Sequence, residues 1–371
     1  PRVNAYRAMA IYYPEILAYL ERSRMLYRDA VSDLPPCPTL SCDVELRPYQ
    51  RKALDAWIDA GKRGVIVLPT GAGKTYIALK AIQLLNTPTL VVVPTLDLMD
   101  QWRRHLSTRF KMEVGVYGGG EDVLKPLTVS TYDSAYLRAE HLGNKFMFII
   151  FDEVHHLPAP SYSQIAEMYI APCRMGLTAT YEREDMGHEE LPRLVGGRVY
   201  QIGVEALAGK HLSPYTHEKV FVDLTPEEQR LYNEQHSIFT DYMRRKGLVL
   251  KSPEDFQEFI MRTGGDPEAR EALLARNRAL KTALNSEAKI KALGDFLKIY
   301  REEKALIFTL HNQLVYKISR RFLVPAVTYQ TPKEERKEIL EKFKAGRYGA
   351  IVTSQVLDEG IDVPDASIGF I

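Results

Sequence analysis

Short apolar runs alternate with helical patterns between about residues 46 and 201, which is typical of βαβ units around a parallel sheet. The runs are continuous rather than alternating, as expected for strands with two buried faces. They predict strands at residues 65–68, 90–93, 127–130, 148–151 and 175–177. The pattern therefore predicts an α/β domain with helices on both faces of its sheet.

A second series of the same kind follows residue 304, with strands expected at 305–308, 326–329 and 349–352. The apolar residues 366–371 look like part of the same, unfinished sheet. Residues 225 to about 290, between the two series, carry helix signals and no convincing strand. They begin with Thr225-Pro226-Glu227-Glu228, which matches a capping box. This segment predicts a helical insertion.

A chain of 371 residues exceeds what one hydrophobic core usually organises, so two domains are expected. We predict a first domain at residues 41–202 and a second at 203–371, with the insertion at about 225–290 inside it. Residues 1–40 are interpreted as the remnant of a preceding domain and a proline-rich linker. The missing initial methionine and the stop inside an apolar stretch predict that both ends are trimmed.

The composition of the chain bears on which partners and which cellular compartment we expect for the protein. Lysine and arginine number 49 against 48 acidic residues, so any attraction to nucleic acid must come from local patches. Cys37, Cys42 and Cys173 have no neighbouring ligands that would complete a zinc site, which predicts reduced thiols. No apolar run of membrane-spanning length and no signal peptide is visible. We therefore expect a cytoplasmic protein without a membrane partner, associated with the nucleoid if prokaryotic.

A phosphate-binding loop is predicted where the first buried strand runs into Gly71-Ala72-Gly73-Lys74-Thr75. The glycines Gly71 and Gly73 let backbone N–H groups converge on phosphate oxygens at the start of a helix. Lys74 would reach the terminal phosphates and the Thr75 hydroxyl would bind magnesium. Leu68 stands where the full pattern has its first glycine, so a glycine-rich turn without a ligand is the alternative.

Two carboxylates favour ATP hydrolysis over that alternative. The strand at 148–151 delivers Asp152 and Glu153 to its carboxyl end, 78 residues after Lys74. Ligands bind at this edge of a parallel sheet. Asp152 would hold Mg²⁺ and Glu153 would orient the water that attacks the γ-phosphate, with Lys74 as the third catalytic residue. A charged strand end followed by surface histidines is the other interpretation.

The stretch Asp152-Glu153-Val154-His155-His156 resembles the DExH box of superfamily 2 helicases. Other family elements follow in the family's order. The resemblance implies that Gln50 recognises adenine, that Thr95 and Thr131 lie in elements gripping a strand's phosphates, and that residues 177–180 couple hydrolysis to domain movement. Each element alone is a weak signal, and their fixed order is what carries the resemblance.

Arg183, Glu184 and Asp185 are similar to the Arg-Glu-Asp element that XPB-type helicases use in strand separation. The chain therefore resembles XPB-type superfamily 2 DNA helicases, of the archaeal kind, over about residues 44–371. This resemblance implies an α/β fold of two RecA-like parallel-sheet domains in tandem, with a thumb-like helical insertion. It also implies ATP and Mg²⁺ as cofactors.

Residues 354–364 resemble the family's element at the cleft between the domains. The resemblance implies that Gly360 and Asp362 face the nucleotide. It further implies that Ser354, and Thr309 after the strand at 305–308, contact DNA phosphates. Such contacts position a protein without reading sequence, so we expect little base readout and a salt-dependent affinity.

A basic triplet, Arg244-Arg245-Lys246, lies near several aromatic residues in the helical insertion. The resemblance implies that this module grips duplex DNA through the triplet. A solvated helix end above a small aromatic core is an equally good interpretation of the same residues.

These observations predict an ATP-dependent DNA helicase or translocase moving 3′ to 5′, in DNA repair or transcription-linked opening. Two alternatives stay open: a duplex translocase that does not unwind, and an ATP-gated clamp or scaffold. The resemblance also implies a nuclease partner. The family's last element, Gln-x-x-Gly-Arg-x-x-Arg, does not occur within the 371 residues. Since its arginine contributes about 10³ to 10⁵ in rate, we expect slow ATP hydrolysis by this polypeptide.

Overall fold

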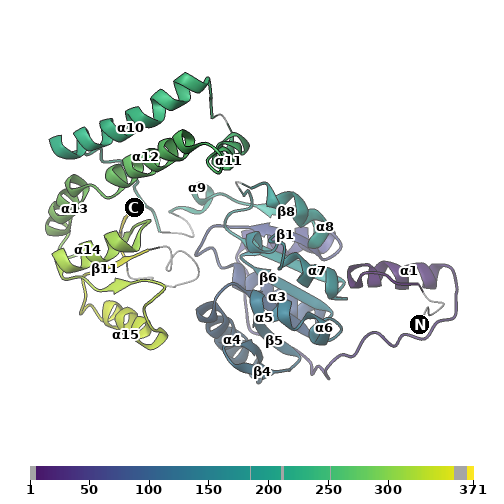
Figure 1. The fold of residues 1–371 in the computed structure, drawn as a ribbon. Helices are drawn as coiled ribbons and strands as arrows, with labels where there is room; N and C mark the ends of the chain where they lie inside the picture. The colour runs from purple at the N-terminus through teal and green to yellow at the C-terminus, as the bar shows by residue number, and fades with distance from the viewer. Residues whose placement is uncertain (1–5, 184, 210–212, 251, 355–365) are drawn as a thin grey trace. The chain divides into compact units, whose positions relative to one another are not determined.

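The computed structural model describes residues 6–183, 185–209, 213–250, 252–354 and 366–371. Contacts divide the chain into two compact units, Pro1–Thr216 and His217–Ile371 (Figure 1). Each unit is built around its own sheet. The predicted fold class, with two parallel α/β sheets in tandem, is confirmed.

The sheet of unit 1 has the strand order β4-β3-β5-β2-β6-β7-β1-β8. Every neighbouring pair is parallel except β3 and β4. All five predicted strands form, and β3, β4 and β8 are additional. The strands are β1 (Arg63–Val67), β2 (Thr89–Val93), β3 (Gly115–Gly118), β4 (Glu121–Val123), β5 (Leu127–Thr131), β6 (Phe148–Asp152), β7 (Cys173–Thr178) and β8 (Arg198–Gln201).

Helices cover both faces of this sheet, as predicted. Ile66, Val91 and Ile150 point into a core with α2 (Pro48–Asp59), α3 (Lys74–Leu85) and α4 (Leu96–Phe110). The alternate strand residues, such as Val92 and Phe151, point into a second core. Its helices are α5 (Tyr132–Leu137), α6 (Ala139–Leu142), α7 (Ser163–Met168) and α8 (Leu191–Leu194). Burial on both sides explains why the strands are apolar throughout.

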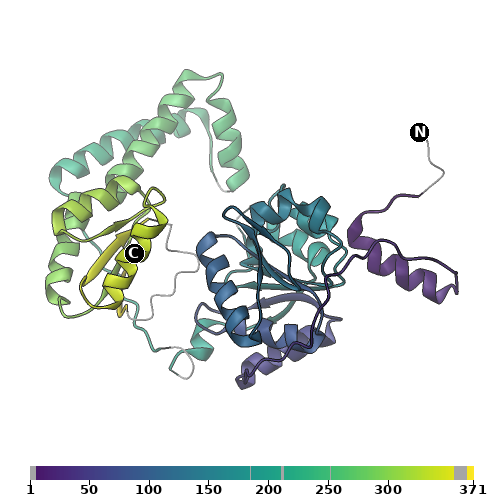
Figure 2. The same ribbon diagram turned by 90° about the horizontal axis from the view of Figure 1, so that it is seen from below.

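The remaining elements of unit 1 are short. The turn η1 (Ala10–Tyr12) contacts α7, and α1 (Tyr13–Arg22) stands apart from the sheet (Figures 1 and 2). The turn η2 (Val154–His156) follows β6 directly. The turn η3 (Gly187–Glu190) precedes α8, and α9 (Val204–Leu207) follows β8.

Unit 2 contains a four-stranded parallel sheet in the order β10-β11-β9-β12. Its strands are β9 (Ala305–Phe308), β10 (Ala326–Val327), β11 (Ala350–Thr353) and β12 (Ile368–Phe370). One face packs against α13 (Glu287–Ile299) and α14 (Asn312–Phe322), and the other against α15 (Lys333–Lys344). The strand β10 is shorter than predicted, because the chain turns after Val327, where the Thr328 N–H donates to the Thr331 hydroxyl at 2.9 Å and the Thr331 N–H donates to the Thr328 carbonyl at 3.0 Å.

The predicted helical insertion consists of α10 (Pro226–Lys246), α11 (Pro253–Arg262) and α12 (Pro267–Leu284). The capping box at its start forms. Thr225 Oγ1 accepts from the Glu228 N–H at 3.3 Å, and Glu228 Oε2 accepts from the Thr225 N–H at 3.1 Å. The other oxygen of Glu228 accepts from the Glu287 N–H at 2.6 Å, which ties α10 to the start of α13. The aromatic residues near the basic triplet form the small core of this module, around Tyr242 and Phe259.

A buried arginine joins β7 to the segments that flank it. The Arg174 side chain is fully buried and donates to the carbonyl oxygens of Ala171 at 3.1 Å, Leu194 at 2.6 Å and Tyr169 at 2.9 Å. Burial lowers the pKa of Arg174 to about 9, so the guanidinium is still charged at neutral pH. Its hydrogen bonds satisfy carbonyl groups that water does not reach.

We expect Arg174→Leu to lower the free energy of unfolding of unit 1 by about 3 kcal/mol or more, because it leaves buried carbonyl groups without donors. Arg193→Leu is the matched control. Arg193 is 44% exposed and pairs with Glu167 and Glu190, so its loss is expected to cost about 1 kcal/mol or less. Urea unfolding curves of the two variants measure the difference, and equal midpoints would contradict the assigned role.

Candidate nucleotide-binding site

The loop after β1 has the backbone conformation that a phosphate-binding loop needs. Gly71 and Gly73 have positive φ angles of 79° and 76°, in the region that residues with a Cβ disfavour. Gly73 is also the N-cap residue of α3. A Cβ on residue 73 would lie 2.5 Å from Gln50 Nε2, so any other residue there would strain the backbone and displace the Gln50 amide.

The first turn of α3 offers unpaired donors. Within the described part of the chain, no carbonyl oxygen accepts a hydrogen bond from the backbone N–H of Gly73, Lys74 or Thr75. Lys74 Nζ lies over the loop and donates to the Leu68 carbonyl at 3.1 Å. Several N–H groups and an ammonium group at the positive end of a helix are the donors that a phosphate group accepts. The residues present therefore fit a nucleotide phosphate.

Gln50 supports this loop from α2. Its side-chain Nε2 donates to the Ala72 carbonyl at 2.9 Å, and its Oε1 accepts from the Arg47 N–H at 2.9 Å. The neighbouring Tyr49 hydroxyl donates to the same Ala72 carbonyl at 2.8 Å. Gln50 is 3% exposed, so its amide serves the loop here, and adenine recognition by this residue stays a prediction.

Asp152 ends β6 at the same edge of the sheet as the loop. The strand order β6-β7-β1 separates the two by two strand spacings, or roughly 10 Å. Burial and the neighbouring Glu153 raise the pKa of Asp152 to about 6, while the charge of Lys74 acts in the opposite direction. Lys74 and Asp152 are therefore within electrostatic reach of each other, and a cation between them would replace the missing solvation of the carboxylate.

Two hydrogen bonds hold the Asp152 carboxylate in place. Trp102 Nε1, from α4, donates to Oδ2 at 2.7 Å. The Glu153 N–H donates to Oδ1 at 3.1 Å. The Trp102 side chain is only 2% exposed and faces Asp152. Periodicity alone marks it as a core residue of α4 and gives no sign of this partner.

Glu153 lies in a strained position beside two polar side chains. Its φ of 47° is left-handed, which costs a residue with a Cβ about 1–2 kcal/mol. Its Oε2 lies 3.5 Å from both His155 Nδ1 and Thr178 Oγ1, and these two atoms are 3.0 Å apart. Thr178 ends β7, so the tertiary fold brings the DExH-like box and the element at 177–180 into direct contact.

Arg183 also contacts the box. Its Nη1 donates to the His155 carbonyl, and its Nε and Nη2 donate to the carboxylate of Asp185 at 2.8 and 2.5 Å. The Arg183 guanidinium and the Gly187 N–H hold the pKa of Asp185 well below its usual range. Glu184 lies outside the described residues. Arg183 and Asp185, the described part of the Arg-Glu-Asp element, are thus linked to the main chain two residues after Glu153.

The two candidate strand-binding threonines cap neighbouring helices. Thr95 Oγ1 accepts from the Leu98 N–H at 3.3 Å at the start of α4, and Thr131 Oγ1 accepts from the Ser134 N–H at 3.2 Å at the start of α5. A Cβ on Gly118 would lie 3.1 Å from Met99 Sδ and 3.4 Å from Ser134 Oγ, so both first turns pack around this glycine. The structure brings the two caps to one part of the sheet edge.

In unit 2, Thr309 and Ser354 follow the adjacent strands β9 and β11. The Thr309 N–H donates to the Thr353 carbonyl at 2.9 Å, which keeps the two strand ends together. Gly360 and Asp362 lie outside the described residues. Arg244 pairs with Asp241 at 3.1 Å, Arg245 approaches Glu268 at 3.7 Å, and Lys246 lies over the Tyr242 ring at 5.9 Å.

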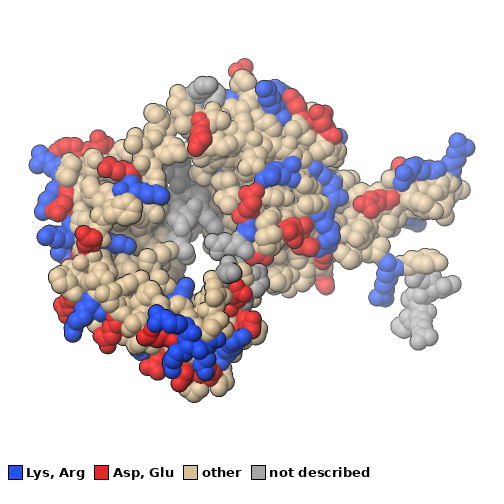
Figure 3. All heavy atoms as spheres, turned by 90° about the horizontal axis from the view of Figure 1, so that it is seen from above, with Lys and Arg blue, Asp and Glu red and all other residues tan. Residues whose placement is uncertain are grey.

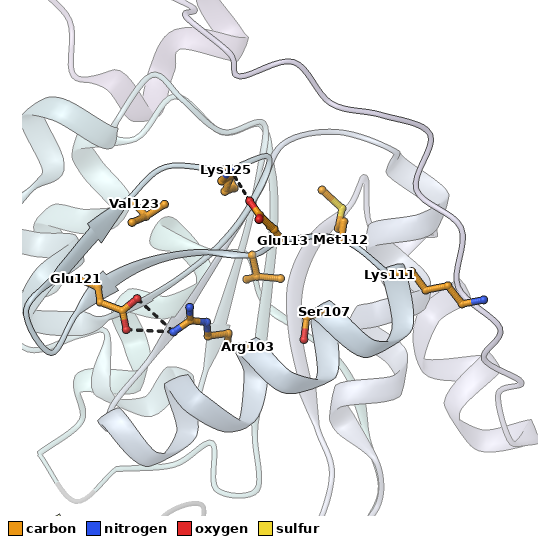
Figure 4. A pocket seen from close by; sticks show the side chains of 9 residues that line it. Arg103, Ser107, Lys111, Met112, Glu113, Glu121, Val123 and Lys125 are labelled. Carbon is orange, nitrogen blue, oxygen red and sulfur yellow. Dashed lines mark hydrogen bonds and ion pairs between the residues drawn. The ribbon is translucent and has the colours of Figure 1, made fainter.

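Two hollows were not predicted from the sequence. One of about 380 Å³ in unit 2 is lined mainly by residues of α12 and α14, of which Arg278, Lys281 and Lys317 are cationic. Their distance along the sequence hides this grouping. The other, of about 660 Å³, lies beside α4 and β4 (Figure 4). Four of its charged side chains form ion pairs, Arg103 with Glu121 at 3.1 Å and Lys125 with Glu113 at 2.8 Å, and it contains none of the candidate residues.

The described residues contain no group of three or more His, Cys, Asp or Glu residues that could hold a metal ion. Cys37, Cys42 and Cys173 are free thiols. None of the helices described is both long and apolar enough to cross a membrane.

Comparison with known proteins adds the family. Residues 43–183 match the model described as "Type III restriction enzyme, res subunit", and residues 288–371 match "Helicase conserved C-terminal domain". The chain is 47% identical over 369 residues to the "DNA 3'-5' translocase XPB2" of Sulfurisphaera tokodaii, covering 100% of this chain and 84% of that protein. The chain belongs to the XPB family.

A more distant XPB relative is the "General transcription and DNA repair factor IIH helicase/translocase subunit XPB" of Schizosaccharomyces pombe. It is 26% identical over 383 residues, which cover 97% of this chain and 42% of the yeast protein. The crystal structure of the Pyrococcus furiosus Hef helicase domain has a TM-score of 0.53 at 18% identity, covering 87% of this chain and 88% of that one. This likeness supports the helicase fold of the XPB-family chain.

The pKa of Asp152 predicts how magnesium-dependent nucleotide affinity changes with pH. The ionised carboxylate is the form that binds a cation, so the affinity should be constant above about pH 7. It should fall below the folded-state pKa of about 6, approaching tenfold per pH unit. Asp152→Asn should bind weakly with a flat profile. Titrations of the wild type and of Asp152→Asn with a fluorescent ADP analogue and Mg²⁺ between pH 5 and 8 measure the two affinity profiles.

The same pKa fixes the sign of its effect on stability without nucleotide. A carboxyl group whose pKa rises from 3.8 to about 6 on folding is protonated more readily in the folded chain. Its contribution is fully present below pH 3.8 and is lost as pH rises through 6. As pH rises from 3.8 to 6, the free energy of unfolding of Asp152→Asn should therefore increase relative to that of the wild type. A relative decrease over this pH range would contradict the raised pKa.

Proposed function

We propose that this chain is an ATP-dependent DNA translocase of the XPB family, moving 3′ to 5′ and opening DNA strands. The observation that carries the proposal is the arrangement of the phosphate loop, Lys74 and the buried Asp152 at one edge of one sheet. The match to a 3′–5′ translocase over the whole chain supports it. DNA repair or transcription-linked opening is the proposed context, since the yeast relative's name refers to both.

Each candidate residue has a chemical task in this proposal. The N–H groups around Gly71 and Gly73 bind phosphate oxygens, and Lys74 contacts the terminal phosphates. Thr75 and Asp152 would hold Mg²⁺, which, when bound, neutralises charge on the β- and γ-phosphates. Glu153 orients the attacking water. The hydrogen bonds of Asp152 and the short distance between Glu153 and Thr178 favour these roles.

DNA is proposed to contact the protein through its phosphates. Thr95 and Thr131 would contact one strand in unit 1, and Thr309 and Ser354 would do so in unit 2. On the face drawn in Figure 3, lysine and arginine side chains lie among aspartate and glutamate side chains. With a net charge of +1, local contacts rather than the overall field would have to supply the affinity. We propose strand separation for Arg183 to Asp185.

Several assignments remain predictions. Gly360 and Asp362 at the nucleotide, and Glu184 in strand separation, rest on the sequence resemblance alone. The implied nuclease partner also rests on that resemblance. A duplex translocase that does not unwind and an ATP-gated clamp are the alternative functions, and hydrolysis-deficient protein distinguishes the clamp from the motor.

Glu153→Gln should bind nucleotide normally but hydrolyse ATP at least about 100-fold more slowly, because the amide cannot activate water. A motor would then lose strand displacement and translocation together. Glu167→Gln is the matched control, since Glu167 pairs with Arg193 at 2.8 Å and no hydrogen bond or ion pair of the described residues joins it to the site. If Glu153→Gln keeps its function without hydrolysis, the protein is a clamp. If the wild type translocates without unwinding DNA and Glu153→Gln loses translocation, the protein is a duplex translocase.

Neutralising the basic triplet (Arg244→Gln, Arg245→Gln, Lys246→Gln) should weaken duplex binding and flatten its salt dependence. Each lost phosphate contact lowers the slope of log K against log salt by about 0.9. Binding should be nearly independent of DNA sequence. The control Lys298→Gln, Arg301→Gln removes exposed, surface-paired charges of the same unit. Anisotropy titrations at several salt concentrations test this, and an unchanged slope would mean that the triplet is only a solvated helix end.

A further inference from the structure

Asp152 is held from both faces of the sheet of unit 1. On one face, Trp102 Nε1 of α4 donates to its carboxylate at 2.7 Å. On the other, the Tyr132 hydroxyl of α5 donates to its main-chain carbonyl at 3.1 Å. Trp102 belongs to the core that contains α2 to α4, and Tyr132 to the core that contains α5 to α8. The candidate magnesium ligand is therefore connected to both helical layers.

Each of these helices begins at a candidate strand-binding threonine. Thr95 caps α4, and Trp102 follows two turns later, about 10 Å along the axis. Thr131 caps α5, and Tyr132 is the first residue of that helix. A single helical segment and a single hydrogen bond thus separate each cap from Asp152.

Both connections run through buried, closely packed side chains. Trp102 lies on the buried stripe of α4 with Leu98, Leu106 and Phe110. The Tyr132 ring stacks on Phe151 at 6.4 Å and packs against Tyr162 at 5.2 Å. Close-packed interiors transmit displacements rather than absorbing them, and buried hydrogen bonds are costly to break. A shift of either cap would therefore move the Asp152 carboxylate or its backbone.

We propose that Trp102 and Tyr132 are positioning residues that couple strand binding at the α4 and α5 caps to the geometry of Asp152. The proposal rests on the proposed function, since it takes Thr95 and Thr131 as strand contacts and Asp152 as the magnesium ligand. Energetic coupling between sites is reciprocal, so bound Mg²⁺-nucleotide changes strand affinity by the same factor as the strand changes nucleotide affinity. Strand binding alone can therefore report on the coupling.

The coupling factor is the ratio of single-strand affinities with and without Mg²⁺ and a non-hydrolysable ATP analogue. For the wild type we expect it to fall in the usual range of about 5 to 150. Trp102→Phe and Tyr132→Phe each remove one hydrogen bond to Asp152 while keeping an aromatic ring. Each should reduce the factor at least about threefold, with strand affinity in the absence of nucleotide changed less than about twofold.

Two control variants remove similar groups without touching Asp152. Arg103→Gln changes the next residue of α4, whose side chain pairs with Glu121. Tyr162→Phe removes a hydroxyl that donates to Asp133 at 2.7 Å, from a ring that packs against Tyr132. Both should keep the wild-type coupling factor, because helix packing survives and the hydrogen bonds to Asp152 remain.

A spectroscopic measurement on the unmutated chain avoids folding problems in the Trp102 variant. The chain has two tryptophans, so 5-fluorotryptophan labelling gives two fluorine resonances. Trp57 is the internal reference, since its Nε1 donates to the Arg174 carbonyl at 2.9 Å, away from Asp152. We expect the Trp102 resonance to shift on adding single-stranded DNA without nucleotide, and on adding Mg²⁺-ADP without DNA, while the Trp57 resonance stays in place.

The outcomes separate this inference from the proposed function. Three results together would overturn the inference and leave the motor function intact. The wild type binds both ligands with a coupling factor above one, the Trp102 and Tyr132 variants keep that factor, and DNA does not move the Trp102 resonance. A wild type that binds neither DNA nor nucleotide overturns the proposed function and the inference with it. Reduced coupling in the Trp102 and Tyr132 variants, but not in the controls, supports both.

Discussion

Parallel pairing of β6, β7 and β1 is the constraint on which the site depends. Pairing in this order places Asp152, Thr178 and the loop that follows β1 at the carboxyl ends of three adjacent strands. Residues that are distant along the chain then meet at one edge of the sheet. Helices cover both faces of the sheet and keep water from the strands. Only one strand register then buries every apolar residue.

Burial at this edge gives the polar groups their character. Asp152 sits in a poorly solvated position and keeps its proton more readily than an exposed aspartate would. Glu153 adopts a left-handed conformation, and its neighbours hold it there. Strain and unfavourable solvation of this kind persist where the surrounding structure fixes them, and they concentrate at functional sites. A bound cation would relieve the electrostatic part.

Local chemistry was the part of the fold that the sequence predicted best. The five buried strands of unit 1 and the capping box at Thr225 depend on neighbours in the chain, and all of them form. The strands β4 and β8 escaped prediction because their residues are exposed or half-buried at the sheet's edges, without an apolar run. The strand β10 ended early because the chain turns at residues 328–331, with hydrogen bonds between Thr328 and Thr331.

The sequence by itself determined the family and the order of the motifs, and it predicted which residues carry phosphate and carboxylate chemistry, because these depend on residue type and spacing. Tertiary structure alone decided what each group touches. It brought Trp102 to the Asp152 carboxylate, and it tied Gln50 to the loop after β1. Hydrogen bonds across a sheet join residues by position in space, and separation along the chain does not encode that position.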